Sequence, residues 1–294
     1  MTRAARASLA VLAAAALFGT SATSQALLMP DAPPAAVADL RLIVGSLGLI
    51  AVVWWRLGPR VLAALWRRPA IWLMGVFVAG YQACFFIGAD RTGVAIGTLA
   101  SLALAPFLAG LLGWALREGA PGWVWAASTV VAVIGLAFLT LGSAGSVDPI
   151  GVLAAGGAGA SYAVYTVLGA RLARGGEHPS AVLATSFSVG AVILVPFVVL
   201  AGLWWLTPEG IAMVLWLGLI ATTLAYLLFG VGLAVLQPGH IATLNLAEPV
   251  VATVLGVLIL GERLPVAGWI GCVLIIIALA MLGLMENRRR EVRA

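Results

Sequence analysis

Apolar residues fall in ten long runs along the chain, separated by short polar stretches. Each run has about 20 residues or more, enough for a helix to cross a hydrocarbon core of ~30 Å. Strands of a membrane β-barrel would have about 9–11 residues of alternating polarity, which these runs lack. The pattern therefore predicts an all-α polytopic membrane protein with ten transmembrane helices. The runs cover residues 7–29, 35–55, 70–89, 93–116, 122–142, 149–170, 180–203, 209–236, 240–260 and 265–285.

The first run also has features of a secretory signal peptide. Arg3 and Arg6 precede it, and residues 21–26 (Ser-Ala-Thr-Ser-Gln-Ala) resemble a cleavage region. The apolar stretch nevertheless continues to Met29, which makes it long enough to span a bilayer. We therefore expect a first helix that is retained.

Composition excludes soluble proteins. Hydrophobic residues make up 63% of the 294 residues, charged residues make up 9%, and the mean hydropathy is +1.13. A soluble domain carries roughly 25% charged residues. The net charge of +5 would suit a nucleic-acid binder, but every basic residue is an arginine and most lie in short clusters between apolar runs. The predicted partner is the lipid bilayer, and we expect no nucleic acid.

The arginines predict how the chain is oriented in the membrane. If the N-terminus is cytoplasmic and all ten helices span, only Arg41, Arg91 and Arg263 fall toward the outer face. This positive-inside bias predicts a multi-pass protein of the inner or plasma membrane with both termini in the cytoplasm. The thirteen arginines on the cytoplasmic side would be Arg3, Arg6, Arg56, Arg60, Arg67, Arg68, Arg117, Arg171, Arg174, Arg288, Arg289, Arg290 and Arg293.

Two segments of the chain resemble each other. Residues 106–113 (Pro-Phe-Leu-Ala-Gly-Leu-Leu-Gly) match residues 249–256 (Pro-Val-Val-Ala-Thr-Val-Leu-Gly) at four of eight positions. After a one-residue shift, three more pairs align: Glu118 with Glu262, Pro121 with Pro265, and Trp125 with Trp269. We therefore predict two repeats of five helices each, residues 1–146 and 147–294.

The odd number of helices in each repeat has a mechanistic consequence. The second repeat must enter the membrane in the opposite orientation to the first. Inverted repeats are common in secondary transporters, where the solute site lies near the bilayer midplane between the two repeats. The repeat therefore favours alternating access.

Several short motifs carry a resemblance to a known family. They are Asn-Leu-Ala-Glu-Pro-Val at 245–250, Leu-Ile-Leu-Gly-Glu-Arg-Leu at 258–264, Gly-Trp-Ile-Gly at 268–271, Phe-Gly-Thr-Ser at 18–21, and Arg41. With these motifs the whole chain resembles the EamA-type family of the drug/metabolite transporter superfamily. The resemblance implies ten helices in two inverted repeats that move small metabolites such as amino acids, usually outward.

Glu248 is the main candidate for chemistry. It lies about eight residues inside the ninth run, where a charge costs several kcal/mol unless it faces a wet cavity or a partner. Pro249 is expected to free the carbonyl of Asn245, whose side chain shares a helix face with Glu248. The functional interpretation is a polar contact for substrate or proton, and the alternative is a brace between helices. The first repeat has Ala105 at the aligned position, so only one repeat supplies this carboxylate.

Four further residues inside the runs are candidates for the wall of a solute cavity. They are Tyr81, Tyr165, Tyr226 and Thr98, the last placed on the opposite wall by the repeat. Tyr162 is the alternative to Tyr165 on the sixth helix. The functional interpretation is a cavity whose rings and hydroxyls hold an organic solute. The alternative is hydrogen bonding between helices or anchoring at the membrane interface. Arg41, close to Asp39, is interpreted as an interfacial anchor of the second helix.

Motifs of enzymes and of ATP-driven pumps are absent from the sequence. It contains no His-Glu-x-x-His zinc motif, no Gly-x-x-x-x-Gly-Lys phosphate loop and no cysteine cluster. We therefore expect no cofactor, no metal and no enzymatic activity.

The sequence thus predicts a secondary active transporter that exports small organic metabolites, such as amino acids, by alternating access. Its partner is a small-molecule substrate, and Glu248 is a candidate for proton coupling. A passive channel or facilitator for small solutes is the alternative function. A membrane-embedded enzyme acting on lipid would need clustered polar residues at one membrane face, and the sequence shows none.

Overall fold

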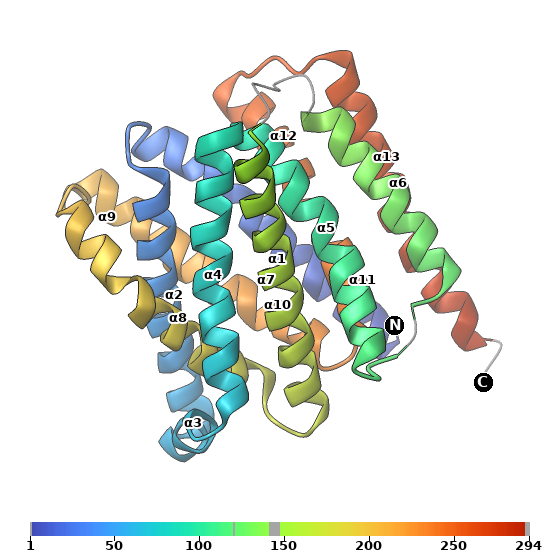
Figure 1. The fold of residues 1–294 in the computed structure, drawn as a ribbon, viewed down its shortest axis with the longest axis horizontal. Helices are drawn as coiled ribbons and strands as arrows, with labels where there is room; N and C mark the ends of the chain where they lie inside the picture. The colour runs from blue at the N-terminus through green and yellow to red at the C-terminus, as the bar shows by residue number, and fades with distance from the viewer. Residues whose placement is uncertain (1, 120, 141–147, 292–294) are drawn as a thin grey trace.

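The computed structural model describes residues 2–119, 121–140 and 148–291, and these residues form one bundle of helices (Figure 1). No strand occurs within those ranges. The elements are α1 (Arg3–Leu28), α2 (Pro34–Leu57), α3 (Pro59–Trp66), α4 (Pro69–Thr92), α5 (Val94–Ala115), α6 (Trp123–Thr140), α7 (Pro149–Arg174), α8 (Pro179–Ala201), α9 (Pro208–Leu215), η2 (Trp216–Leu224), α10 (Ala225–Leu233), α11 (Pro238–Leu244), α12 (Ala247–Leu260) and α13 (Val266–Glu291).

Ten helical stretches of the described chain are long and apolar enough to cross a membrane, which confirms the predicted ten-helix fold. The eighth stretch is α9, η2 and α10 together, and the ninth is α11 with α12. Many helices begin at a proline. The first turn of a helix does not need the N–H that proline lacks, and the φ angle of proline suits a helix. Seven helices begin with proline: α2, α3, α4, α7, α8, α9 and α11. The predicted boundary between residues 146 and 147 lies outside the described residues.

The first helix is an integral part of the bundle. Ala7, Val11 and Ala14 on α1 are fully buried, and α1 packs on α10 and α12. Gly19 allows the close approach to α12, because a Cβ there would lie 2.8 Å from the Glu248 carbonyl oxygen. The first run therefore packs as a transmembrane helix of the core.

Most of the described arginines lie near the helix ends at one end of the bundle, which we call the arginine-rich end. Ion pairs join its connections: Arg68 pairs with Glu177, and Arg174 pairs with Glu118 at 3.1 Å. The connections from α2 to α4, α5 to α6 and α7 to α8 all lie at this end, the lower end in Figure 1. The other end carries the connections from α1 to α2 and α4 to α5. Successive spans therefore alternate in direction, as ten membrane crossings require.

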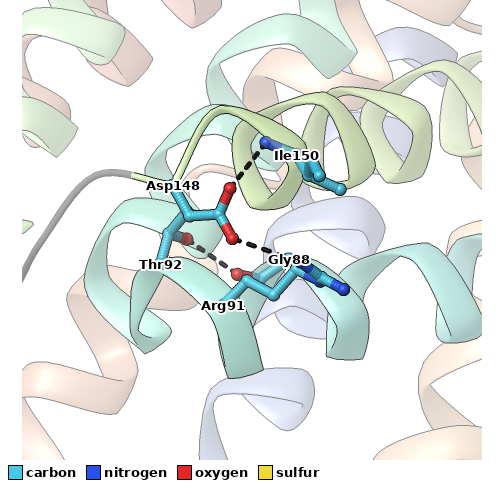
Figure 2. Close-up of polar contacts among 5 residues, drawn as sticks. All are labelled: Gly88, Arg91, Thr92, Asp148 and Ile150. Carbon is cyan, nitrogen blue, oxygen red and sulfur yellow. Dashed lines mark hydrogen bonds and ion pairs between the residues drawn. The ribbon is translucent and has the colours of Figure 1, made fainter.

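The opposite end is held by an ion pair between the last turn of α4 and the start of α7 (Figure 2). The Asp148 carboxylate accepts a hydrogen bond from the Ile150 N–H at 2.8 Å and caps α7. Its second oxygen lies 3.3 Å from Nη1 of Arg91. The Ile150 N–H is the main cause that lowers the pKa of Asp148 below its ordinary value of 3.8, and Arg91 contributes to the same effect.

We expect Asp148→Ala to lower the apparent Tm of the purified protein at pH 7, because the first turn of α7 loses its cap and Arg91 loses its partner. Asp148→Asn should lose less, since its amide oxygen still accepts the Ile150 N–H. The folded-state pKa is lowered, so the carboxylate stabilises the fold above its ordinary value of 3.8 and stops doing so as the pH falls through the lowered pKa. Thermal unfolding at several pH values measures this. An unchanged Tm for Asp148→Ala at pH 7 would contradict the assignment.

Two of the ten spans are not regular α-helices. In the eighth span η2 is a π-helix of nine residues, and its Thr222 hydroxyl donates to the Leu217 carbonyl at 2.7 Å. The Thr223 hydroxyl interacts with the Gly45 carbonyl of α2 at 3.0 Å. The ninth span is interrupted between α11 and α12. Irregular backbone within a membrane is tolerated where it is buried in protein or lines a cavity.

The aligned segments of the two repeats end in the same way. At the end of α5 the Glu118 N–H donates to the Gly113 carbonyl at 2.8 Å. At the end of α12 the Glu262 N–H donates to the Gly256 carbonyl at 3.2 Å. These are the glycine and glutamate pairs that the sequence alignment matches. The repeats differ before this point, because α5 runs unbroken through Pro106, whereas the chain is interrupted ahead of Pro249.

Candidate functional site

Aromatic rings from five elements meet in the middle of the bundle. Tyr226 is the hub: its ring centroid lies 4.9 Å from that of Phe18 and 4.3 Å from that of Phe187. The Tyr162 and Tyr165 centroids are 5.1 Å apart, and the Tyr81 centroid lies 6.2 Å from that of Tyr162 and 6.5 Å from that of Tyr165. We call this set the aromatic cluster: Phe18, Tyr81, Phe85, Tyr162, Tyr165, Phe187, Tyr226 and Phe229.

All four tyrosines of the chain belong to this cluster. Tyrosine in membrane proteins is otherwise enriched at the two interfaces, where its hydroxyl reaches water. Tyr162 and Tyr165 are buried, and the hydroxyls of Tyr165 and Tyr226 interact with each other. The cluster therefore brings polar atoms into the centre of the bundle, where interfacial anchoring does not account for them.

A small cavity lies beside the cluster. Its volume is about 20 Å³, enough for about one water molecule. The Gln82 side chain lines it and is 5% exposed, and its Nε2 has no hydrogen-bond partner in the described chain. We call this space the central cavity, and its walls are Arg41, Leu42, Val78, Tyr81, Gln82, Tyr165, Phe187, Thr222 and Tyr226.

Four consecutive residues of α1 organise the surroundings of the central cavity. Phe18 packs on Tyr226, and Gly19 lies against the backbone of Glu248. The Thr20 hydroxyl accepts a hydrogen bond from Nε1 of Trp216 at 3.1 Å, and Ser21 Oγ accepts one from Nη1 of Arg41 at 3.2 Å. Successive helix residues point in different directions, so this single turn contacts four other elements. These are the Phe-Gly-Thr-Ser residues singled out in the sequence.

Glu248 and Asn245 come together at the break in the ninth span. The Asn245 Nδ2 donates to Glu248 Oε2 at 3.4 Å, while the buried Asn245 Oδ1 has no partner in the described chain. Glu248 lies in the first turn of α12, where the N-terminal end of the helix dipole favours a negative charge. Pro249 follows it, at a position whose N–H would have no partner within the helix. The interruption thus provides a place for a carboxylate inside the membrane.

The expectation of a free Asn245 carbonyl is wrong. That carbonyl accepts the Glu248 N–H at 3.0 Å. The reason is that the chain turns at residues 245–246 rather than continuing as an α-helix, and the carbonyl pairs with the residue three positions ahead instead of four. The polar groups available at this point are the side chains of Asn245 and Glu248.

Arg41 is a site residue that the sequence interpretation missed. The described residues contain no ion pair between Arg41 and Asp39, because positions two apart on a helix point away from each other. Arg41 lines the central cavity and interacts electrostatically with Glu248 and Tyr226. The signal available in the sequence was the presence of Arg41 among the motifs that carry the family resemblance.

The structure brings most of the predicted site residues together. Tyr81, Tyr165 and Tyr226 line the central cavity, and Glu248 with Asn245 lies within electrostatic range of it. Thr98 is partly exposed on α5 and is not among the residues that line the cavity. Its place on an opposite wall stays a prediction. No three His, Cys, Asp or Glu side chains gather as metal ligands would in the described ranges.

A second and larger cavity opens at the arginine-rich end. Its volume is about 720 Å³, and Arg3, Arg6 and Arg56 line it. Apolar residues of α10 form another wall, including Leu227, which follows Tyr226 of the central cavity. The large cavity therefore lies along α10 and the residues that follow it.

A protein-family model, the EamA-like transporter family, matches the chain twice, over residues 5–141 and 149–284. The chain belongs to the EamA-like transporter family. The double match shows two repeats of one unit, each holding five of the ten spans. The aromatic cluster of this EamA chain draws Phe18, Tyr81 and Phe85 from the first matched segment and its other members from the second.

Similar proteins cover most of the EamA chain. The uncharacterized transporter YwfM of Bacillus subtilis is 39% identical over 280 residues, 95% of this chain and 92% of that protein. The threonine/homoserine exporter RhtA of Escherichia coli is 34% identical over 245 residues, 81% of this chain and 77% of that protein. A solved crystal structure superposes with a TM-score of 0.81 at 25% identity and covers 96% of this chain and 98% of its own.

Proposed function

We propose that this EamA transporter is a secondary active exporter of small organic metabolites, such as amino acids, and that it works by alternating access. The observation that carries the proposal is the aromatic cluster with its central cavity, built from α1, α2 and α4 of the first repeat and α7, α8, η2 and α10 of the second. A pocket shared between two repeats changes shape when the repeats move against each other. The similarity to a threonine/homoserine exporter makes L-threonine and L-homoserine the first solutes to test.

The sidedness of the molecule supports outward movement. The arginine-rich end is assigned to the cytoplasm by the positive-inside rule, which also places both termini there and suits the inner or plasma membrane. Arg288, Arg289, Arg290 and Arg293 belong to this assignment, but their side chains lie outside the described residues. The cavity of about 720 Å³ opens at this end, whereas the central cavity holds about 20 Å³. A solute would enter from the cytoplasm and pass the aromatic cluster once the walls separate.

Counterflow in proteoliposomes tests the proposal. Vesicles loaded with unlabelled L-threonine or L-homoserine should take up the labelled solute faster than vesicles without internal solute. The reason is that an occupied carrier returns to its outward-facing state more quickly than an empty one. Uptake should saturate with solute concentration. A passive channel or facilitator, the alternative function, would show no acceleration by solute on the far side. Vesicles without protein are the control, and flux that is neither saturable nor accelerated would overturn alternating access.

A further inference from the structure

Arg41 and Glu248 carry opposite charges near the central cavity, and they interact electrostatically without forming an ion pair in the described chain. Arg41 lines the central cavity, and Glu248 interacts with it electrostatically. No ion pair within 4.0 Å joins them in the described chain. Arg41 is held by the neutral Ser21 hydroxyl at 3.2 Å, and Glu248 by the neutral Asn245 amide at 3.4 Å. Both residues are partly buried, and a buried charge is costly unless it is paired or hydrogen-bonded, so each side chain can still bind a charged group of a ligand.

Both side chains are held in place by their neutral neighbours. The Ser21 bond fixes the Arg41 guanidinium from α1, and Arg41 is partly buried. Glu248 is fixed by the break between α11 and α12 and by Gly19, which lets α1 approach its backbone. A guanidinium presents paired N–H donors that match the two oxygens of a carboxylate. The Glu248 carboxylate presents only acceptors, which match an ammonium group.

We propose that this pair recognises a zwitterion, with Arg41 binding the carboxylate and Glu248 the ammonium group of an α-amino acid. The proposal rests on the proposed function and names its substrate class. A zwitterion carries one charge of each sign a few bonds apart, which suits two site charges that lie within electrostatic range but beyond ion-pair distance. Gln82 adds an unpartnered amide to the cavity wall.

The remaining walls select the side chain of that amino acid. Arg41 is the only charged residue among the residues that line the central cavity. The other walls are aromatic rings, aliphatic groups, the Thr222 hydroxyl and the Gln82 amide. A charged side chain would find no counter-charge there, and burying it unpaired is costly. The substrate class is therefore α-amino acids with small uncharged side chains.

Binding of blocked analogues tests the proposal. The probes are L-threonine, its methyl ester, which lacks the carboxylate, and N-acetyl-L-threonine, which lacks the ammonium group. Affinity is measured by competition against labelled L-threonine on the full-length protein in nanodiscs. We expect both analogues to bind the unmodified protein about 10- to 100-fold more weakly than L-threonine, the loss of one charged hydrogen bond.

Variants separate the two charges. Arg41→Gln should weaken L-threonine by about 10- to 100-fold and leave the methyl ester unchanged, because the ester has no carboxylate for Arg41 to bind. Glu248→Gln should weaken L-threonine and the methyl ester and leave N-acetyl-L-threonine unchanged. Arg91→Gln is the matched control, since Arg91 pairs with Asp148 away from the cavity. Should Arg41→Gln fail to fold, Arg41→Lys keeps the charge without the paired donors and should still prefer L-threonine to its ester.

The outcomes separate this inference from the proposed function. If L-threonine is transported but the ester competes as well as the parent, or Arg41→Gln weakens both equally, the zwitterion site is overturned and the transporter proposal stands. If none of the uncharged standard amino acids binds or shows counterflow, the named substrate class fails. If other solutes then show saturable counterflow, the amino-acid substrate class is overturned but the transporter proposal stands.

Discussion

Replacing Glu248 with glutamine is expected to abolish the response of transport to a pH gradient. Glutamine has nearly the same size and can keep the contact with Asn245, but it cannot bind and release a proton. Flux of L-threonine in proteoliposomes, measured with and without a pH jump, tests this. Counterflow needs no net proton movement, so it should persist in the variant at saturating solute concentration.

Glu118→Gln is the matched control for that experiment. Glu118 is a glutamate at the end of a membrane-spanning helix, and it pairs with Arg174 at the arginine-rich end. Its variant should respond to the pH jump as the unmodified protein does. A Glu248→Gln protein that keeps its full response would show that the carboxylate braces the helices and does not carry a proton.

Gly19→Ala is expected to reduce both stability and transport. A Cβ at this position would lie 2.8 Å from the Glu248 carbonyl oxygen and 2.9 Å from the Val251 Cβ, so α1 and α12 must move apart. Overpacking of this kind costs about 1–3 kcal/mol. The same shift displaces Glu248 from Arg41, so counterflow should fall as well. Thermal unfolding and counterflow are the measurements.

Gly283→Ala serves as the control for Gly19→Ala, because no atom of the described residues lies within 4 Å of a Cβ added there. Alanine favours helices more than glycine does, so this variant should be as stable as the unmodified protein or slightly more stable. If Gly19→Ala and Gly283→Ala unfold at the same temperature, the close contact between α1 and α12 does not contribute to the stability of the protein.

The ten spans were predictable from the sequence because hydropathy reports membrane burial directly. The predicted run 35–55 corresponds to α2, and the run 149–170 begins where α7 begins. Glycine and proline residues in the sequence lie at these helix boundaries. Seven helices begin with a proline, so the sequence marks where these helices start.

The irregular backbone could not be read in the same way. Hydropathy predicts one apolar helix for the eighth span, whereas part of this span is a π-helix that contacts α2. In this contact the Thr223 hydroxyl donates a hydrogen bond to the Gly45 carbonyl. Pro249 signalled a disturbance in the ninth span but not its form. The partner that each backbone group takes depends on the local turn and on the neighbouring helices, which a single sequence does not specify.

The site was predictable in its residue types and less so in its partners. Tyrosines inside apolar runs predict the wall of a solute cavity, with Tyr165 or Tyr162 from the sixth helix, and in the structure both residues belong to the aromatic cluster. Arg41 was missed because an arginine near a helix end looks the same in sequence whether it faces lipid headgroups or the cavity. Its orientation follows from the contact with Ser21 on another helix.

Because the four tyrosines of the chain all lie in the aromatic cluster, an isotope or fluorine label on tyrosine reports on that cluster alone. Biosynthetic incorporation of 3-fluorotyrosine would give four ¹⁹F resonances and no background signal from elsewhere in the polypeptide. Their chemical shifts depend on the local ring currents. The protein therefore carries its own set of spectroscopic reporters at its centre, without any engineered cysteine.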